Sequence, residues 1–406
     1  MIFVKIVYYI LTIIALSYTA YFGISGLLAF KKSKVRIRKF NDKTKFAVLI
    51  AARNEENVVG SLIESLKNQN YDKNLYDIYT LVNNTTDDTA GVASRAGAKV
   101  INVTGNIKCK GDVLKFAFAK LKNTNYDAYV VFDADNVVHP DFLHVMNNIY
   151  QSGYKCAQGR KDSKNMDNWI STGYSLFYAI QNLFFNKART NVKLSATING
   201  TGFMIDKNYI DAGFNPVTVT EDIELSILCI LDGIKVVYTD DAITYDESPN
   251  SFKDSWNQRK RWSIGIMQCC KIYNKRLLRK VIKEHDYSSF DKIIFNIAPY
   301  IQVMSIIPFI LLGIIHMQDI QDGIATIMSF DYTGLIIGYF LSIAISIYTL
   351  QYYNKSVGKN VSGIALFIVF VLSWVPINFI CLNHKKAYKW VPIKHDRNVE
   401  LSSLMR

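Results

Sequence analysis

The chain has 406 residues, half of them apolar, and carries 47 Lys and Arg against 34 Asp and Glu, a formal net charge of +13. This composition excludes intrinsic disorder and collagen-like sequence, and the six Cys show no CxxC pair and no zinc-type spacing, so reduced thiols are predicted. Four apolar runs are long enough to cross or enter a bilayer: 3–30, 292–316, 331–353 and 362–382. The chain is therefore predicted to be membrane-embedded.

The first apolar run, within residues 1–30, is predicted to be a retained anchor with its N-terminus outside. It is longer than the core of a signal peptide and lacks a small-residue cleavage site. A block of basic residues follows at once, where cytoplasmic flanks of membrane helices are found: Lys31, Lys32, Lys34, Arg36, Arg38 and Lys39. At this location the basic residues can contact membrane lipids. The positive charge therefore does not indicate a nucleic-acid partner, and we expect none.

Between residues 31 and 290, short β-branched runs alternate with stretches whose apolar residues have helical spacing. The runs 46–51, 78–82, 99–103 and 128–132 predict buried strands, and 58–67, 89–96 and 110–121 predict the helices between them. This alternation is typical of an open, mostly parallel sheet, whose ligands bind at the carboxyl ends of the strands.

Polar turns follow the first two predicted strands. Ala52, Asn54 and Glu55 come after the first, and a segment that includes Asn84 comes after the second. Free backbone N–H groups and a carboxylate at such a turn can bind a nucleotide. Each turn could equally be an ordinary helix cap.

The fourth predicted strand runs directly into Asp133 and Asp135. Carboxylates at positions i and i+2 project to the same side of a strand. Two like charges so close repel each other unless a cation lies between them, and oxygen ligands suit Mg²⁺ or Mn²⁺ holding a diphosphate. Ordinary turn aspartates are the alternative.

Two further motifs lie on predicted helices. Glu221 and Asp222 follow Thr220 at a helix start, where capping alone could explain them. Gln258, Arg261 and Trp262 share one helix face and combine an amide, a fixed cation and a flat aromatic surface. This set suits a pyrophosphate beside a sugar, although a basic helix that binds lipid head groups is an alternative.

Taken in this order, the motifs resemble those of family 2 inverting glycosyltransferases, in particular the membrane-integrated branch with cellulose, hyaluronan and poly-N-acetylglucosamine synthases. The resemblance covers about residues 45–270 and implies a cytosolic α/β domain of the GT-A (Rossmann-like) type joined to α-helical transmembrane segments.

The resemblance also implies the donor site. Ala52, Asn54 and Glu55 would line the uridine pocket of a UDP-sugar, with Asn84 in a place where the family usually has Asp. Lys110 would approach the diphosphate. Asp133 would contact the nucleotide, and Asp135 would hold Mg²⁺ or Mn²⁺.

On the acceptor side, the resemblance makes Asp222 the catalytic base. Gly202 belongs to the implied acceptor loop, and Glu221, Gln258, Arg261 and Trp262 would hold the pyrophosphate and the acceptor. The tail segment 390–395 resembles a C-terminal signature of some relatives, to which a gating role could be assigned.

Two activities fit these residues. The first is a processive polysaccharide synthase that polymerises a hexose or N-acetylhexosamine, for which a small membrane frame implies an accessory subunit or a homodimer. The alternative is a lipid glycosyltransferase that adds one sugar to a ceramide, a diacylglycerol or a polyprenyl carrier. A non-catalytic relative is disfavoured because every acid of the motifs is present.

The predicted organisation is an N-terminal transmembrane anchor (1–30), a cytosolic transferase domain (31–290), a C-terminal membrane region (291–383) and a basic tail (384–406). We expect a multi-pass protein of the cell membrane with a cytoplasmic catalytic domain. Three full crossings after residue 290 would leave the basic tail outside, so one segment is predicted to cross incompletely. The candidate is 292–316, which Pro299 and Pro308 interrupt.

Overall fold

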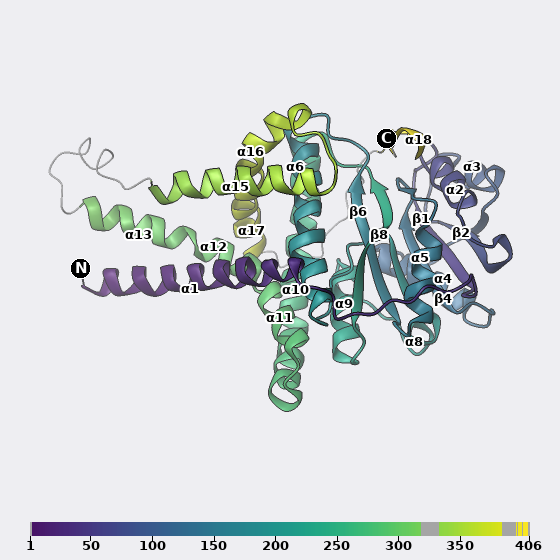
Figure 1. Ribbon diagram of the computed structural model, residues 1–406, viewed down its shortest axis with the longest axis horizontal. Coiled ribbons are helices and arrows are strands. Elements are labelled where there is room, and N and C mark those ends of the chain that lie inside the picture. Colours follow the sequence, from purple (N-terminus) through teal and green to yellow (C-terminus); the bar gives the residue numbers. More distant parts are fainter. Residues whose placement is uncertain (1, 318–332, 384–394, 396, 400, 405–406) are drawn as a thin grey trace.

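The computed structural model describes residues 2–317, 333–383, 395, 397–399 and 401–404. It consists of an α/β domain and a set of long apolar helices that extend from one side of it (Figure 1). Residues 318–332 and most of the predicted tail lie outside the described residues.

The α/β domain is built on one eight-stranded sheet with the order β3-β2-β1-β4-β7-β6-β8-β5. The strands are β1 (Phe46–Ala52), β2 (Tyr76–Val82), β3 (Lys99–Asn102), β4 (Ala128–Asp133), β5 (Val137–Val138), β6 (Cys156–Ser163), β7 (Phe203–Asp206) and β8 (Val236–Asp246). The four strands predicted from the sequence form the parallel half, β3-β2-β1-β4. The other half is mixed, because β7 is antiparallel to both β4 and β6.

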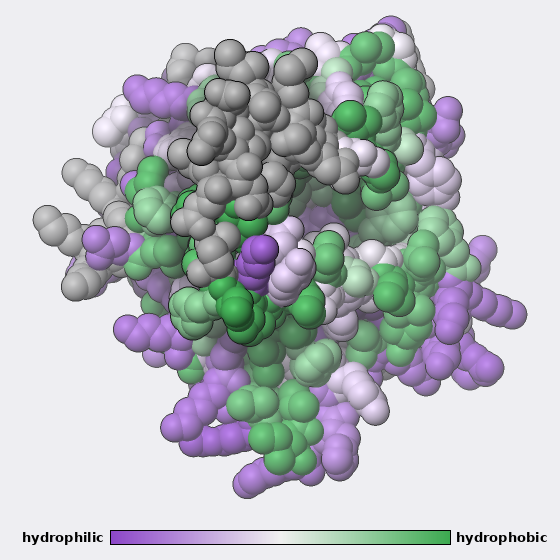
Figure 2. Space-filling model, turned by 90° about the vertical axis from the view of Figure 1, so that its left-hand side faces the viewer, coloured by the Kyte–Doolittle hydropathy of each residue, from purple (hydrophilic) through white to green (hydrophobic). Residues whose placement is uncertain are grey.

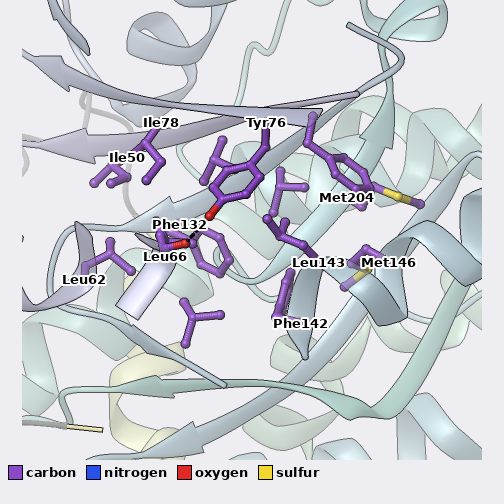
Figure 3. Packing of buried hydrophobic residues seen from close by; sticks show 14 of the residues in the cluster. Ile50, Leu62, Leu66, Tyr76, Ile78, Phe132, Phe142, Leu143, Met146 and Met204 are labelled. Atoms are coloured by element: carbon purple, nitrogen blue, oxygen red, sulfur yellow. Dashed lines mark hydrogen bonds between the residues drawn. The ribbon is translucent and has the colours of Figure 1, made fainter. Parts of the chain in front are cut away.

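Helices cover both faces of the sheet, as expected for strands whose two faces are apolar. One face packs on α2 (Val59–Lys67), α3 (Thr89–Arg95) and α5 (Phe142–Gln151), and the other on α4 (Lys110–Leu121), α8 (Lys207–Asp211) and α9 (Glu221–Leu231). Figure 3 shows the first of these cores, in which Ile50, Phe132 and Met204 of the sheet meet Leu62 of α2 and Phe142 of α5. The Tyr76 hydroxyl is satisfied there by donating to the Leu66 carbonyl oxygen, 2.8 Å away.

Between β6 and β7 the chain forms α6 (Trp169–Ile180), a π-helical turn (Gln181–Lys187) and α7 (Ala188–Asn191). The long α10 (Phe252–Glu284) and α11 (Tyr287–Asn296) form a hairpin beneath the membrane helices (Figure 1). The remaining helices are α1 (Ile2–Gly26), α12 (Ala298–Met304), α13 (Ile306–Met317), α15 (Thr333–Tyr352), α16 (Val361–Leu372), α17 (Trp374–Leu382) and α18 (Leu401–Leu404).

Four helical stretches of the described chain are long and apolar enough to cross a membrane: Ile2–Phe30, Ala298–Ile315, Thr333–Tyr352 and Gly358–Leu382. In Figure 1, α1, α13 and α15 extend together to the left, whereas α16 and α17 stay beside α6. The predicted interruption of 292–316 is confirmed, since helices end at Asn296 and Met304. A second break, at Ser373 between α16 and α17, was not predicted.

The segment from α16 to α17 begins and ends against the same α/β domain. Before it, Lys355 forms an ion pair with Asp162 of β6. After it, the Arg397 backbone N–H donates to the Glu247 carboxylate at 3.2 Å. A chain that starts and ends on one side cannot have crossed once in between. The residues on both flanks of 362–382 therefore contact the same domain, and which segment crosses incompletely stays a prediction.

Candidate active site

The site lies where the parallel strands β1, β2 and β4 end together. In the register of the sheet, Ala51 pairs with Leu81 on one side and with Asp133 on the other. The residues that follow these strands therefore meet at one edge, as the sequence pattern predicts. Ala52, Asn83 and Asp133 all line one cavity of about 320 Å³.

Three carboxylates gather at this edge. Asp133 and Asp135 are joined by Asp246 from the end of β8, and one oxygen of each lies within 4.8 Å of the others. Lys161 balances the third acid, with its Nζ 2.8 Å from Asp246 Oδ2. Lys110 forms an ion pair with Asp133 and also donates to the Gly200 carbonyl oxygen at 2.7 Å.

The protonation of these acids follows from burial and from the lysines. Burial raises the pKa of Asp246 to about 6, although Lys161 opposes the shift. Burial also raises the pKa of Asp135. The pKa of Asp133 is instead held below its usual value because the attraction of Lys110 and Lys161 outweighs burial.

This donor set fits a hard divalent cation. Oxygen ligands from carboxylates are those that Mg²⁺ and Mn²⁺ prefer. A divalent charge would also remove the cost of burying three acids side by side. Asp133, Asp135 and Asp246 could hold the ion; nothing in this set distinguishes Mg²⁺ from Mn²⁺.

A second acidic pair occupies the first turn of α9. Glu221 and Asp222 both line the cavity, at the helix end where the backbone dipole favours negative charge. Burial, followed by repulsion from Asp222, raises the pKa of Glu221 to about 7. Burial also raises the pKa of Asp222, against the backbone N–H of Ile223, Lys110 and Arg261, which favour the ionised form. A raised pKa suits a group that must accept a proton near neutrality.

The loop before α9 is fixed by Glu224, a residue that the sequence analysis did not single out. Glu224 is fully buried and accepts hydrogen bonds from the backbone N–H groups of Val217 (3.0 Å) and Thr218 (2.8 Å). The Tyr273 hydroxyl of α10 donates to the same carboxylate at 2.5 Å. These bonds hold the start of α9, and with it Asp222, against α10.

Helix α10 supplies the opposite wall. Gln258, Arg261 and Trp262 line the cavity together, as their spacing predicts. The neighbouring Arg259 points elsewhere: it is fully buried and donates to the Phe370 carbonyl oxygen at 2.9 Å and to Ser373 Oγ at 2.6 Å. Arg259 thereby satisfies the backbone at the break between α16 and α17.

Trp262 belongs to an aromatic group that joins the α/β domain to the membrane region. Its ring centroid lies 6.3 Å from those of Phe177 of α6 and Trp374 of α17, which are 5.0 Å from each other. All three residues line the cavity. The cavity therefore has a charged end at the acid cluster and an aromatic end at the membrane helices.

Several buried polar atoms on the cavity wall have no hydrogen-bond partner within the described part of the chain. They are Gln258 Oε1, Asn199 Nδ2 and Thr220 Oγ1. Unpaired buried polar atoms are costly, and their presence around one cavity is typical of a site that binds a polar ligand.

The family model described as glycosyltransferase like family 2 matches residues 44–265, more than half of the chain. Among the residues of the described chain that line the cavity, only Ile266, Phe295, Trp374 and His395 lie outside this range. The chain belongs to glycosyltransferase family 2. This family consists of inverting transferases, so the resemblance inferred from the motifs is confirmed.

The names of two curated relatives of this transferase mention a glucosyldiacylglycerol or a glucomannan. A beta-monoglucosyldiacylglycerol synthase of Trichormus variabilis is 23% identical over 303 residues, covering 73% of this chain and 64% of that protein. A probable glycosyltransferase, YdaM, of Bacillus subtilis is 27% identical, covering 63% and 65%. A probable glucomannan 4-beta-mannosyltransferase of Arabidopsis thaliana is 28% identical, covering 47% and 39%. The match thus spans less than two thirds of each of these relatives.

Among solved structures, the transferase is similar to a mannosyltransferase of Pyrobaculum calidifontis in complex with GDP-Man and Mn²⁺. The TM-score is 0.62 at 12% identity, and the match covers 94% of this chain and all of that one. At this identity the similarity shows the fold alone, which is of the GT-A type.

Most residues predicted for the transferase site do come together. Ala52, Glu55, Lys110, Asp133, Asp135, Glu221, Asp222, Gln258, Arg261 and Trp262 all line the cavity. Their individual roles remain predictions.

Three predicted residues are not on the cavity wall. Asn54 accepts from the Thr86 backbone N–H at 2.8 Å and so joins the turns after β1 and β2. Asn84 is exposed with a positive φ of 46°, and the preceding Asn83 lines the cavity instead. Gly202 is packed between strands, where an added Cβ would lie 2.4 Å from Thr244 Oγ1. These three positions shape the backbone around the site.

Two site residues were missed by the sequence analysis. Asp246 ends β8, more than 100 residues after Asp133, and its position after a β-branched run was the available signal.

His395 was noticed only as part of a tail signature. Its Nδ1 lies 3.1 Å from both carboxylate oxygens of Glu55, and its Nε2 lies 3.7 Å from Asp135 Oδ2. Although burial opposes it, these carboxylates raise the pKa of His395 to about 10, so the ring is charged at neutral pH. Segment 390–394 lies outside the described residues.

Proposed function

We propose that this chain transfers a hexose, with inversion, from a UDP-sugar to the head group of a membrane lipid. The supporting observation is the single cavity that runs from the acid cluster to Trp374 on α17. A polar donor would bind at the charged end, and an acceptor held in the bilayer surface would enter at the aromatic end.

At the donor end, Lys110 and Asp133 would contact the diphosphate, and Glu55 and Asn83 would contact the base; all four line the cavity. A divalent cation at Asp133, Asp135 and Asp246 would supply positive charge to the leaving diphosphate. Arg261 adds a planar guanidinium that can bind two phosphate oxygens at once.

At the acceptor end, Asp222 takes the proton from the attacking hydroxyl group. That oxygen forms a bond to the anomeric carbon while the bond to the diphosphate breaks, so no covalent intermediate with the enzyme is required. A positioned base contributes about 10²–10⁴-fold, or roughly 3–5 kcal/mol of barrier. Trp262 and Phe177 offer flat faces on which a sugar ring can stack.

The membrane helices favour a lipid acceptor. Of the described residues that line the cavity, Trp374 alone comes from the stretch 298–382. The cavity thus reaches the inner end of the membrane region without continuing between α1, α13 and α15. A lipid acceptor needs no path across the membrane, and it also needs no accessory subunit.

A processive polysaccharide synthase is the second candidate. The motif Gln258, Arg261 and Trp262 and the glucomannan synthases among the relatives favour it. Such an enzyme must export its product, and the expected accessory subunit or homodimer would then have to complete a channel.

Purified protein in nanodiscs, offered a panel of UDP- and GDP-sugars together with diacylglycerol, ceramide or polyprenyl phosphate, tests the proposal. We expect UDP release from one UDP-sugar only when a lipid acceptor is present, with a product one or two sugars larger than the lipid. A polymer of increasing length without added lipid would instead establish the polysaccharide synthase.

Replacing the base tests the chemistry. Asp222→Asn keeps the shape of the side chain but cannot accept the proton, so transfer should fall by about 10²–10⁴-fold while UDP binding stays nearly unchanged. A variant that retains more than about a tenth of the wild-type turnover would refute the assignment of Asp222.

A further inference from the structure

Helix α10 continues far beyond the catalytic cavity. Its cavity-lining residues lie between Asn257 and Ile266, and the helix runs on to Glu284. His285, with a left-handed φ of 51°, turns the chain into α11, which packs back along α10. In Figure 1 this hairpin projects from the lower side of the molecule, with its tip free.

The outer half of α10 is strongly basic. Five of its side chains are exposed and make no ion pair within the described part of the chain: Lys271, Lys275, Arg276, Arg279 and Lys283. Glu284 is the one acidic residue in 267–284, and it lies 3.5 Å from Lys280. Within the described residues, the charge of this surface is therefore not balanced by ion pairs.

Large apolar side chains are exposed on the same hairpin. On α10, Leu278 and Ile282 are four residues apart and are 51% and 67% exposed. On α11, Tyr287 and Phe290 are three residues apart and are 74% and 42% exposed. Apolar side chains beside long basic ones are typical of helices that lie in a bilayer interface, because Lys and Arg can extend their charges to the head groups.

The orientation of the hairpin fits such a position. In Figure 1, α10 and α11 run across the direction of α1, α13 and α15, at the end where these helices join the α/β domain. Figure 2 looks along the membrane helices from their free ends. At its lower edge, where the hairpin lies, hydrophobic side chains face the viewer between hydrophilic ones.

We propose that the α10–α11 hairpin lies on the bilayer surface and binds the head groups of anionic phospholipids. The exposed apolar residues enter the interface, and the five unpaired basic residues contact negatively charged phosphates. Because α10 also carries Gln258, Arg261 and Trp262, this contact fixes the angle at which the cavity meets the bilayer. The surface lies outside the catalytic cavity, so the proposal is independent of the acceptor.

The first test places a photo-reactive residue on the hairpin. Full-length Ile282→p-benzoylphenylalanine is irradiated in nanodiscs of phosphatidylcholine with phosphatidylglycerol, and adducts are identified by mass. The matched control is Lys120→p-benzoylphenylalanine at the end of α4, on the side of the domain away from the membrane helices. We expect lipid adducts at position 282, enriched in phosphatidylglycerol, and none at position 120.

The second test removes the charge. The triple variant Lys275→Glu, Arg279→Glu, Lys283→Glu, combined with the photo-reactive residue, should lose the enrichment in phosphatidylglycerol. High salt should weaken the enrichment for the unchanged hairpin. The control Lys120→Glu, Lys122→Glu, Lys155→Glu reverses three exposed lysines elsewhere and should keep it.

The absence of lipid adducts at position 282, or adducts that merely follow the lipid composition in every variant, would overturn the proposal. An adduct to a protein would overturn it as well, since it would identify the hairpin as a protein-binding surface. The photo-reactive variant reports on the unchanged basic residues, so the result does not depend on the folding of the triple variant.

Discussion

Arg259 and Arg261 are two residues apart, yet they lie in different surroundings. Arg259 is buried against α16 and α17, whereas Arg261 lines the cavity beside Asp222. Both are the same residue type on one helix, and 200° of helical rotation separates them. The sequence motif assigns Arg261 to the cavity. Arg259 has a structural role instead, because its contacts hold α10 against α16 and α17.

Arg261→Lys keeps the charge but loses the planar fork that binds two phosphate oxygens. We expect turnover to fall at least about tenfold, with unchanged expression and membrane insertion. Steady-state kinetics in nanodiscs provide the measurement. The control is Lys260→Gln on the same helix, which removes a whole charge away from the cavity wall. Equal activity of wild type and Arg261→Lys would contradict the role of Arg261 in binding the diphosphate and would indicate that this helix acts only as a basic surface.

The raised pKa values of Glu221 and Asp222 predict a pH dependence. Asp222 must be ionised to act as a base, and its folded pKa lies above the usual value, so the proton is retained to a higher pH than in an exposed Asp. Activity should therefore be lost on the acid side at a higher pH than for an exposed Asp base. Glu221, whose pKa is raised to about 7, takes up its own proton as the pH falls through that value. A profile of kcat against pH measures this.

Glu221→Gln removes the negative charge beside Asp222 and should move the acidic limb of that profile to lower pH. The control Glu64→Gln changes an exposed carboxylate on α2 and should leave the limb in place. An unchanged limb in Glu221→Gln would show that the two acids do not titrate as a pair.

At the scale of elements, the close approach of α10 to the start of α9 decides where the base lies. Gly265 permits this approach: a Cβ at this position would lie 2.2 Å from Thr220 Oγ1 and 2.7 Å from Thr220 Cβ. A change of the Thr220 rotamer cannot remove the second contact. Thr220 directly precedes Glu221 and Asp222, so the distance between two helices controls the geometry of catalysis.

Gly265→Ala should therefore displace the first turn of α9. We expect a loss of stability of about 1–3 kcal/mol and a fall in kcat larger than the change in KM. Thermal unfolding and steady-state kinetics measure the two effects. Gly313→Ala in α13 is the matched control, since no atom lies within 4 Å of its Cβ position. Full activity of Gly265→Ala would mean that α9 is positioned by other contacts, such as those of Glu224.

At the scale of the whole molecule, the contacts of Lys355 and Arg397 with the α/β domain predict the membrane topology. Three crossings, by α1, α13 and α15, place the N-terminus outside and leave both ends of α16–α17 on the cytoplasmic side. This arrangement resolves the conflict over the basic tail. The incomplete segment is then the last one, whose break at Ser373 is held by Arg259.

Cysteine labelling tests this topology. Lys359→Cys and Asn398→Cys should resist an impermeant thiol reagent in intact cells and react in inverted membrane vesicles, as should Lys120→Cys in the α/β domain. Labelling of Asn398→Cys from outside would mean that α16–α17 crosses after all. The unmodified protein serves as the background, because its described Cys are buried or half-buried.

The sequence by itself determined the parallel half of the sheet, the apolar segments and ten of the residues that line the cavity. These features depend on local periodicity and on the rule that parallel strands place their carboxyl ends at one edge, so residues such as Asp133 and Glu55 could be predicted from a short stretch of chain. The tertiary structure alone decided the place of Asp246 beside Asp133, the exchange of Asn84 for Asn83 on the wall, the structural role of Arg259 and the return of α16–α17 to the domain. Each of these depends on contacts between segments far apart in the sequence, where no local pattern reports which side chain will face which partner.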